Sequence, residues 1–127
     1  MSTWRIEPWD LRLLERDLLK KLRTREHFLF RSLENKIKEY ASSPIEHARA
    51  LGDLQKVKSE VDMWELKFHL KKCELRFMGC LVEEVGIVIF YTLYAFRKKE
   101  QDLRACHKET ARERLKEFKH HGFQNLL

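Results

Sequence analysis

Apolar residues recur every three or four positions along most of this chain. In its first third they run from Leu11 to Tyr40, through Leu14, Leu18, Leu22, Leu29, Leu33 and Ile37. Steps of three, four or seven residues draw one stripe along a helix with 3.6 residues per turn. A second apolar edge, formed by Leu13, Leu19, Phe28 and Phe30, widens the stripe. The pattern predicts an N-terminal helix within residues 1–41 that packs against more than one neighbour.

This helix is expected to end in a turn over residues 42–44. Ser43 suits the N-cap of a following helix, Pro44 suits its first position, and Glu46 completes a capping box. Because a short turn normally makes two helices antiparallel neighbours, the segment predicts a helical hairpin.

A seven-residue repeat then extends from Leu54 to Cys106. Its positions alternate steps of three and four, and only Lys71, Thr92 and Lys99 are not apolar. A repeat held this long is typical of helices that supercoil around a partner. We therefore predict an all-α fold, an antiparallel helical hairpin with a long second helix. This second helix, continuous or interrupted, would form a coiled coil over residues 45–121, and a flexible tail would follow at 122–127.

Residues 85–96 fit the coiled coil less well, because these twelve positions carry no charge and are rich in β-branched and aromatic residues. Three interpretations are open. The segment is a helix buried on all sides, which we take as the working interpretation, or an extended strand that interrupts the helix. The third is a segment that touches a membrane, although twelve residues are too few to span one, since a bilayer needs about 20.

Charge and cysteine content indicate the kind of partner and the cellular compartment. The chain has 127 residues and a formal charge of +6, with basic ends and a nearly neutral middle. This excess favours acidic partners, but acidic residues interrupt most basic clusters, so nucleic-acid binding is not expected. The three cysteines are odd in number and fit a reducing compartment, which predicts a cytoplasmic protein, with the nucleus as the alternative. The charged N-terminal residues do not resemble a secretory signal.

Residues suited to catalysis do not gather in the sequence. The chain has no glycine-rich phosphate loop and no serine in a nucleophile motif. His69 and Cys73 have the spacing of two zinc ligands on a helix, but a structural site needs four and no second pair follows. We therefore predict no catalytic residues, no metal and no cofactor.

The segment Trp64-Glu-Leu-Lys-Phe-His-Leu-Lys-Lys-Cys-Glu74 resembles part of the coiled-coil region of WHAMM/JMY-type actin nucleation factors. The similarity lies in Phe68, Leu70 and the run from Lys72 to Glu74. In that family the region is implicated in membrane and microtubule association, so the resemblance implies a cytoskeleton-associated role. The actin-binding tail has no counterpart here, and actin nucleation is not implied.

These observations predict a non-catalytic interaction or scaffold protein that joins a larger assembly as a homo- or hetero-oligomer. Large apolar side chains on the heptad face would contact the partner. The residues expected there are Trp64, Phe68, Met78, Val82, Ile89 and Phe96. The alternative is a peripheral membrane-surface protein, in which the segment 85–99 inserts shallowly and Arg97, Lys98 and Lys99 meet anionic headgroups or another acidic partner.

Overall fold

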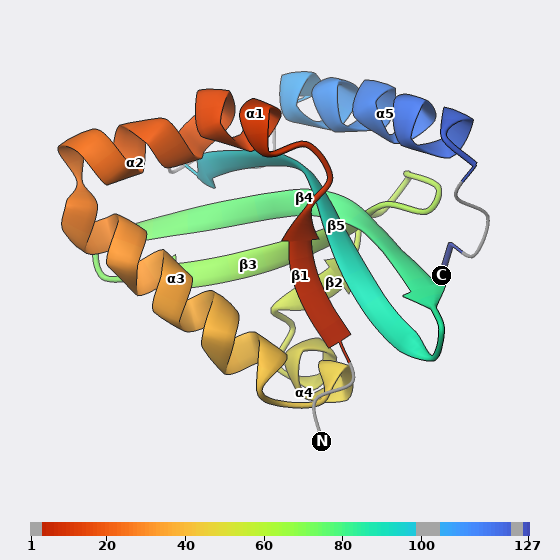
Figure 1. Ribbon diagram of the computed structural model, residues 1–127, viewed down its shortest axis with the longest axis horizontal. Helices are drawn as coiled ribbons and strands as arrows, with labels where there is room; N and C mark the ends of the chain where they lie inside the picture. The colour runs from red at the N-terminus through yellow and green to blue at the C-terminus, as the bar shows by residue number, and fades with distance from the viewer. Residues whose placement is uncertain (1–3, 99–104, 123–125) are drawn as a thin grey trace.

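The computed structural model describes residues 4–98, 105–122 and 126–127. These residues form a mixed α/β fold built on one five-stranded sheet (Figure 1). The prediction of an all-α coiled coil is therefore wrong. The elements in chain order are β1 (Trp4–Pro8), α1 (Leu11–Leu14), the π-helical turn η1 (Glu15–Leu19), α2 (Lys20–Arg25), α3 (His27–Ala41), α4 (Ile45–Ala50), β2 (Leu54–Lys56), β3 (Trp64–Leu70), β4 (Cys73–Glu84), β5 (Ile87–Lys98) and α5 (Ala105–His120).

The sheet has the strand order β1-β5-β4-β3-β2. Strands β2 to β5 pair antiparallel with their neighbours, whereas β1 adds to β5 in parallel. The register of β4 against β5 shifts between Met78 and Gly79. A Cβ atom on Gly79 would overlap the carbonyl oxygen of Tyr91, so the close approach of the two strands requires glycine there.

The predicted long helix over residues 45–121 is replaced by α4, four strands and α5. From Trp64 to Leu70 apolar and polar residues alternate strictly, which is the period of a strand with one buried face. The steps of three and four imitated a heptad because the strands bury side chains on both faces. The turns between the strands consist of Lys71-Lys72 and Val85-Gly86, without the proline or Asn-Gly signals that usually mark hairpins.

The first third of the chain is helical over much of its length, but it does not form one helix. It opens with strand β1, and the helical stretch breaks at Glu26, where φ is −135°. Residues 42–44 separate α3 from α4, and Pro44 stands at the N-cap of α4 with no side-chain capping bond. Helix α4 then ends after six residues at Ala50, so no long second helix follows this turn.

One core lies between the sheet and the N-terminal helices. Leu14, Leu18 and Leu22 pack here with residues of α3 and with Phe68, Leu75 and Phe77 from the sheet. Tyr40 fixes α3 to the sheet, because its hydroxyl donates to the carbonyl oxygen of Lys67 at 2.6 Å.

A second core lies on the opposite face, since consecutive strand residues point to opposite sides. There Met78, Cys80 and Val82 of β4 pack under Leu115 and Phe118 of α5. Helices thus cover both faces of the central strands, which explains the uncharged stretch at 85–96. That stretch is β5 with the turn before it, so the strand interpretation replaces the buried helix.

Candidate functional site: a basic cleft beside helix α5

Helix α5 covers only part of its sheet face, and a cleft of about 740 Å³ opens beside it. The cleft brings together α4, β2 and the residues after it, three neighbouring strands and the first turns of α5. Its lining residues are Arg49, Leu54, Gln55, Lys56, Val57, Lys58, Trp64, Glu65, Lys67, Arg76, Lys98 and Lys108.

The lining is strongly basic, with seven cationic side chains and a single carboxylate, Glu65. Arg76 and Lys98 are engaged by carboxylates of the sheet. No ion pair with another described residue is formed by Arg49, Lys56, Lys58, Lys67 or Lys108. Five positive charges therefore line the cleft without an ion-pair partner among the described residues, which makes the cleft attractive to anions.

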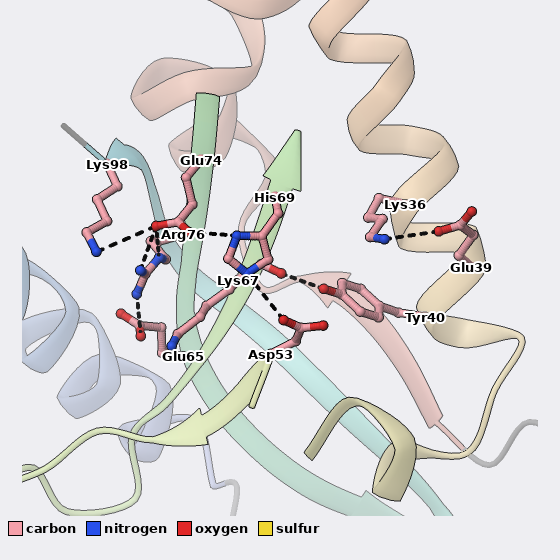
Figure 2. A network of polar contacts seen from close by, with 10 residues as sticks. All are labelled: Lys36, Glu39, Tyr40, Asp53, Glu65, Lys67, His69, Glu74, Arg76 and Lys98. Atoms are coloured by element: carbon pink, nitrogen blue, oxygen red, sulfur yellow. Dashed lines mark hydrogen bonds and ion pairs between the residues drawn. The ribbon is translucent and has the colours of Figure 1, made fainter. Parts of the chain in front are cut away.

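Arg76 forms the rigid floor of the cleft (Figure 2). Its guanidinium donates to Oε1 of Glu65 at 2.7 Å and to Oε2 of Glu74 at 3.0 and 2.6 Å. The three residues face the same side of adjacent strands, since Glu65 pairs with Met78 and Arg76 with Lys67 in the register. Arg76 and Glu65 are each 8% exposed, so the charges are fixed in direction and poorly screened by water.

Glu74 extends this network to the edge of the sheet. Oε2 of Glu74 lies 3.6 Å from Lys98 and Oε1 lies 2.7 Å from Nδ1 of His69, whose Nε2 lies 3.3 Å from Asp53 (Figure 2). Burial raises the pKa of Glu74, but the hydrogen bonds from Arg76 and the nearby cations outweigh it and hold the pKa below its usual value. Glu74 therefore remains an anion and keeps Arg76 and Lys98 in place.

A second fixed group lies at the α4 side of the cleft. The guanidinium carbon of Arg49 lies 5.1 Å from the centre of the Trp64 ring. Trp64 is itself held, because it is 7% exposed and its Nε1 donates to the carbonyl oxygen of Leu127 at 3.0 Å. The ring is thus a cation–π partner of the Arg49 guanidinium.

The segment between β2 and β3 is anchored to α5. Arg112 donates to both oxygens of Glu60 at 2.9 and 2.8 Å, and Lys119 lies 3.0 Å from Asp62. Ser59 and Asp62 both have positive φ, at 65° and 60°, so this path of the backbone is one that few side chains favour. These ties hold Lys58 at the cleft and connect its position to that of α5.

Comparisons with protein-family models, with curated proteins and with solved structures find no match. The chemistry of the cleft must therefore be judged from its own residues. Lysines and an arginine without an ion-pair partner can bind phosphate groups, whereas the paired residues of the floor supply fixed charge.

The residues predicted to form a coiled-coil seam lie inside the molecule. Trp64 and Phe68 belong to the core under the N-terminal helices, and Met78, Val82 and Phe96 belong to the core under α5. Ile89 is 5% exposed. These side chains are large and apolar, as expected of partner contacts, but they pack against the chain's own strands and helices. The seam they were assigned to does not exist in this fold.

The three basic residues predicted to meet a membrane or an acidic partner differ in their surroundings. Lys98 lines the cleft, whereas Arg97 points elsewhere and donates to the carboxylate of Glu26 at 3.0 and 2.8 Å. Lys99 lies outside the described residues. Within the part of the chain that the structure describes, no helix is long and apolar enough to cross a membrane.

The pair His69 and Cys73 is not a pair of helical ligands. The two residues lie on β3 and β4 on either side of a hairpin turn, and His69 instead contacts Glu74 and Asp53. Among the described residues, no group of three or more His, Cys, Asp or Glu side chains is arranged to hold a metal ion.

Sequence inspection missed the cleft because its cations are scattered from Arg49 to Lys108. Acidic neighbours in sequence, such as Glu60 and Glu109, suggested that the basic charge was compensated locally. In the strands, however, consecutive residues point to opposite faces. Lys67 and Arg76 therefore lie on the same face of the sheet, and the residues next to them in sequence lie on the other. The alternation of apolar and polar residues from Trp64 to Leu70 is the signal in the sequence that indicates a strand, and with it which side chains share a face.

Proposed function

We propose that this protein binds single-stranded RNA in the cleft beside α5. The observation that supports the proposal is the excess of cations in the lining, seven against one carboxylate. Five of the seven form no ion pair with another described residue. Such an excess attracts anions, and a chain of phosphates supplies several negative charges at once.

The shape of the cleft favours a single strand over a duplex. A volume of about 740 Å³ suits one or two nucleotides. A DNA duplex is usually bound by an element that enters its major groove, about 12 Å wide, and an RNA duplex by contacts across its shallow minor groove. A concave site offers neither. Leu54 and Trp64 are 2% and 7% exposed, so the apolar contact that the lining offers to an unstacked base comes from the partly exposed Val57.

Two lining groups favour RNA over DNA. Glu65 supplies a carboxylate and Gln55 an amide oxygen, and both can accept a hydrogen bond from a ribose 2′-hydroxyl. This hydroxyl is the group by which proteins distinguish the two nucleic acids. Deoxyribose offers no donor at that position.

The test compares two variants that lose the same charge. One carries alanine at four cleft lysines, Lys56, Lys58, Lys67 and Lys108. The control carries alanine at four exposed basic residues of the first helical stretch, Arg16, Lys20, Lys21 and Arg25. Binding to a labelled oligouridine of about eight nucleotides is followed by fluorescence anisotropy at low salt.

We expect the cleft variant to bind about a hundredfold more weakly than the wild type and the control variant to change severalfold at most. The DNA strand and an RNA duplex should bind more weakly than the RNA strand. An equal loss of affinity in both variants would show that binding depends only on net charge, and it would contradict a binding cleft.

Strand cleavage is a second candidate function, favoured by the position of Glu65 beside the fixed guanidinium of Arg76. Only Oε1 of Glu65 is held by Arg76, which leaves Oε2 to take the proton from a 2′-hydroxyl as its oxygen attacks the adjacent phosphorus. The bond from phosphorus to the 5′-oxygen breaks, a lysine ammonium gives that oxygen a proton, and the cations offset the charge of the phosphorane.

Cleavage would leave a 2′,3′-cyclic phosphate, which mass spectrometry of the products detects. Replacement of the attacking ribose by deoxyribose should abolish it, and Glu65→Gln should slow it by at least about a hundredfold while RNA remains bound. Intact RNA after long incubation with the wild type would leave binding as the function.

We also propose an intracellular setting, in keeping with the three cysteines, which are all free thiols. The scaffold role expected from the sequence depended on a coiled-coil seam, and we do not propose it for this fold.

A further inference from the structure

Arg49 differs from the other cations of the cleft in what it can recognise. Five of the seven are lysines, whose ammonium groups act as point charges and bind any phosphate. Arg76 is the other guanidinium, and its Nε, Nη1 and Nη2 all donate to Glu65 or Glu74. Among the described residues of the lining, Arg49 is thus the one planar fork of N–H donors with no protein acceptor.

The cation–π contact with Trp64 restrains this fork. The guanidinium carbon lies 5.1 Å from the ring centre, and the ring is nearly buried and hydrogen-bonded to the C-terminal residue. A restrained guanidinium loses less freedom when it forms two parallel hydrogen bonds than a mobile one does. Its free edge then presents two donors side by side in one plane.

We infer that Arg49 selects guanine at one position of the bound strand. This inference rests on the proposed RNA binding and adds sequence preference to it. The Hoogsteen edge of guanine offers two neighbouring acceptors, O6 and N7, which match the two donors of the fork. Adenine places an amino donor beside N7, which leaves one N–H of the fork facing another donor.

The preference is measured with four probes, which are a plain short oligouridine and the same strand with one central guanosine, adenosine or cytidine. We expect the wild type to bind the guanosine probe about tenfold more tightly than the other three. Replacement of the guanosine by 7-deazaguanosine, which lacks the N7 acceptor, should remove most of this gain.

Arg49→Lys is the decisive variant, because it keeps the charge and loses the planar fork. Its affinity for the guanosine probe relative to plain oligouridine should fall from about tenfold to about one, whatever its affinity for plain oligouridine. Lys58→Ala is the matched control, and it should weaken the binding of all four probes evenly while the preference remains. Arg49 is exposed, so its lysine variant should keep the fold, which circular dichroism would check.

The outcomes separate the two claims. If the wild type binds all four probes equally, or prefers cytidine, guanine selection by Arg49 is contradicted and RNA binding stands. If Arg49→Lys keeps the guanosine preference, the fork is not its source. If no probe binds, both the inference and the proposed function fail.

Discussion

At the scale of single residues, Val85 carries backbone strain at the tip of the sheet. It has φ +50° in a two-residue turn with Gly86, a conformation that β-branched side chains rarely adopt. The side chain is fully exposed at 101%, so nothing in the fold compensates for the strain by packing.

Val85→Asn should therefore stabilise the protein, because asparagine favours the first central position of such a type I′ turn. We expect the free energy of unfolding to rise by about 1 kcal/mol, measured by urea denaturation. Val61→Asn is the control, since Val61 is also exposed but has no positive φ, and it should change stability little. A destabilised Val85→Asn variant would contradict the strained turn.

Replacement of Arg76 should show how much its ion pairs at the floor of the cleft contribute to the free energy of unfolding. Arg76→Met leaves Glu65 and Glu74 near each other without their shared cation, and we expect a loss of about 3 kcal/mol at neutral pH. Lys98→Met is the control, because its longer contact of 3.6 Å to Glu74 is more open to water.

The same variant predicts a pH dependence. In the wild type the pKa of Glu74 lies below its usual value, so its stabilising contribution is full above the unfolded pKa and is lost as pH falls through the folded one. Removal of Arg76 removes the main cause that lowers this pKa. The stability difference between the two proteins should thus narrow as pH falls from 7 towards 3, and a constant difference would contradict the assigned cause.

At the scale of elements, α5 is tied to the N-terminal helices by one buried ion pair. Arg114 donates to Asp17 of η1 at 2.5 Å and to the carbonyl oxygen of Leu93 at 2.8 Å, and the two side chains are 13% and 9% exposed. This pair bridges helices at opposite ends of the chain, which lie close together in Figure 1.

We expect Arg114→Met to cost about 3 kcal/mol, because it leaves Asp17 buried without its cation. The double variant with Asp17→Leu should recover part of this loss, with a coupling energy of at least about 1 kcal/mol in a double-mutant cycle. The exposed pair of Arg23 and Glu15 is the control and should give less than about 1 kcal/mol. Additive effects of the two substitutions would show that the ion pair does not stabilise the contact between α5 and η1.

Elements near the N-terminus were easier to predict than the sheet. The stripe of Leu14, Leu18 and Leu22 is buried as its spacing indicates, because a helix with one covered face keeps a simple period. In β4 and β5 both faces are covered, so apolar residues occupy consecutive positions and the alternation typical of a strand is lost. Residues three and four positions apart are then also apolar, which resembles the pattern of a helix. Lys71-Lys72 gave no turn signal either.

At the scale of the whole molecule, the cleft could not be predicted because it exists only after the sheet forms. Arg49, Arg76 and Lys108 come from α4, β4 and α5, and no local pattern connects them. Their convergence depends on the strand register and on α5 leaving part of the sheet uncovered. The predicted coiled-coil seam was wrong because it treated Phe68 and Met78 as surface residues, whereas the sheet and its covering helices bury both.

The most direct test of RNA binding in this cleft is an NMR titration of the labelled protein with a short oligouridine. Our account predicts that amide shifts change at residues of the cleft lining, above all around Lys56, Lys67 and Lys108, and not along the first helical stretch at Arg16 and Lys20. Shifts spread over all basic surfaces, or gathered on that helical stretch, would contradict it.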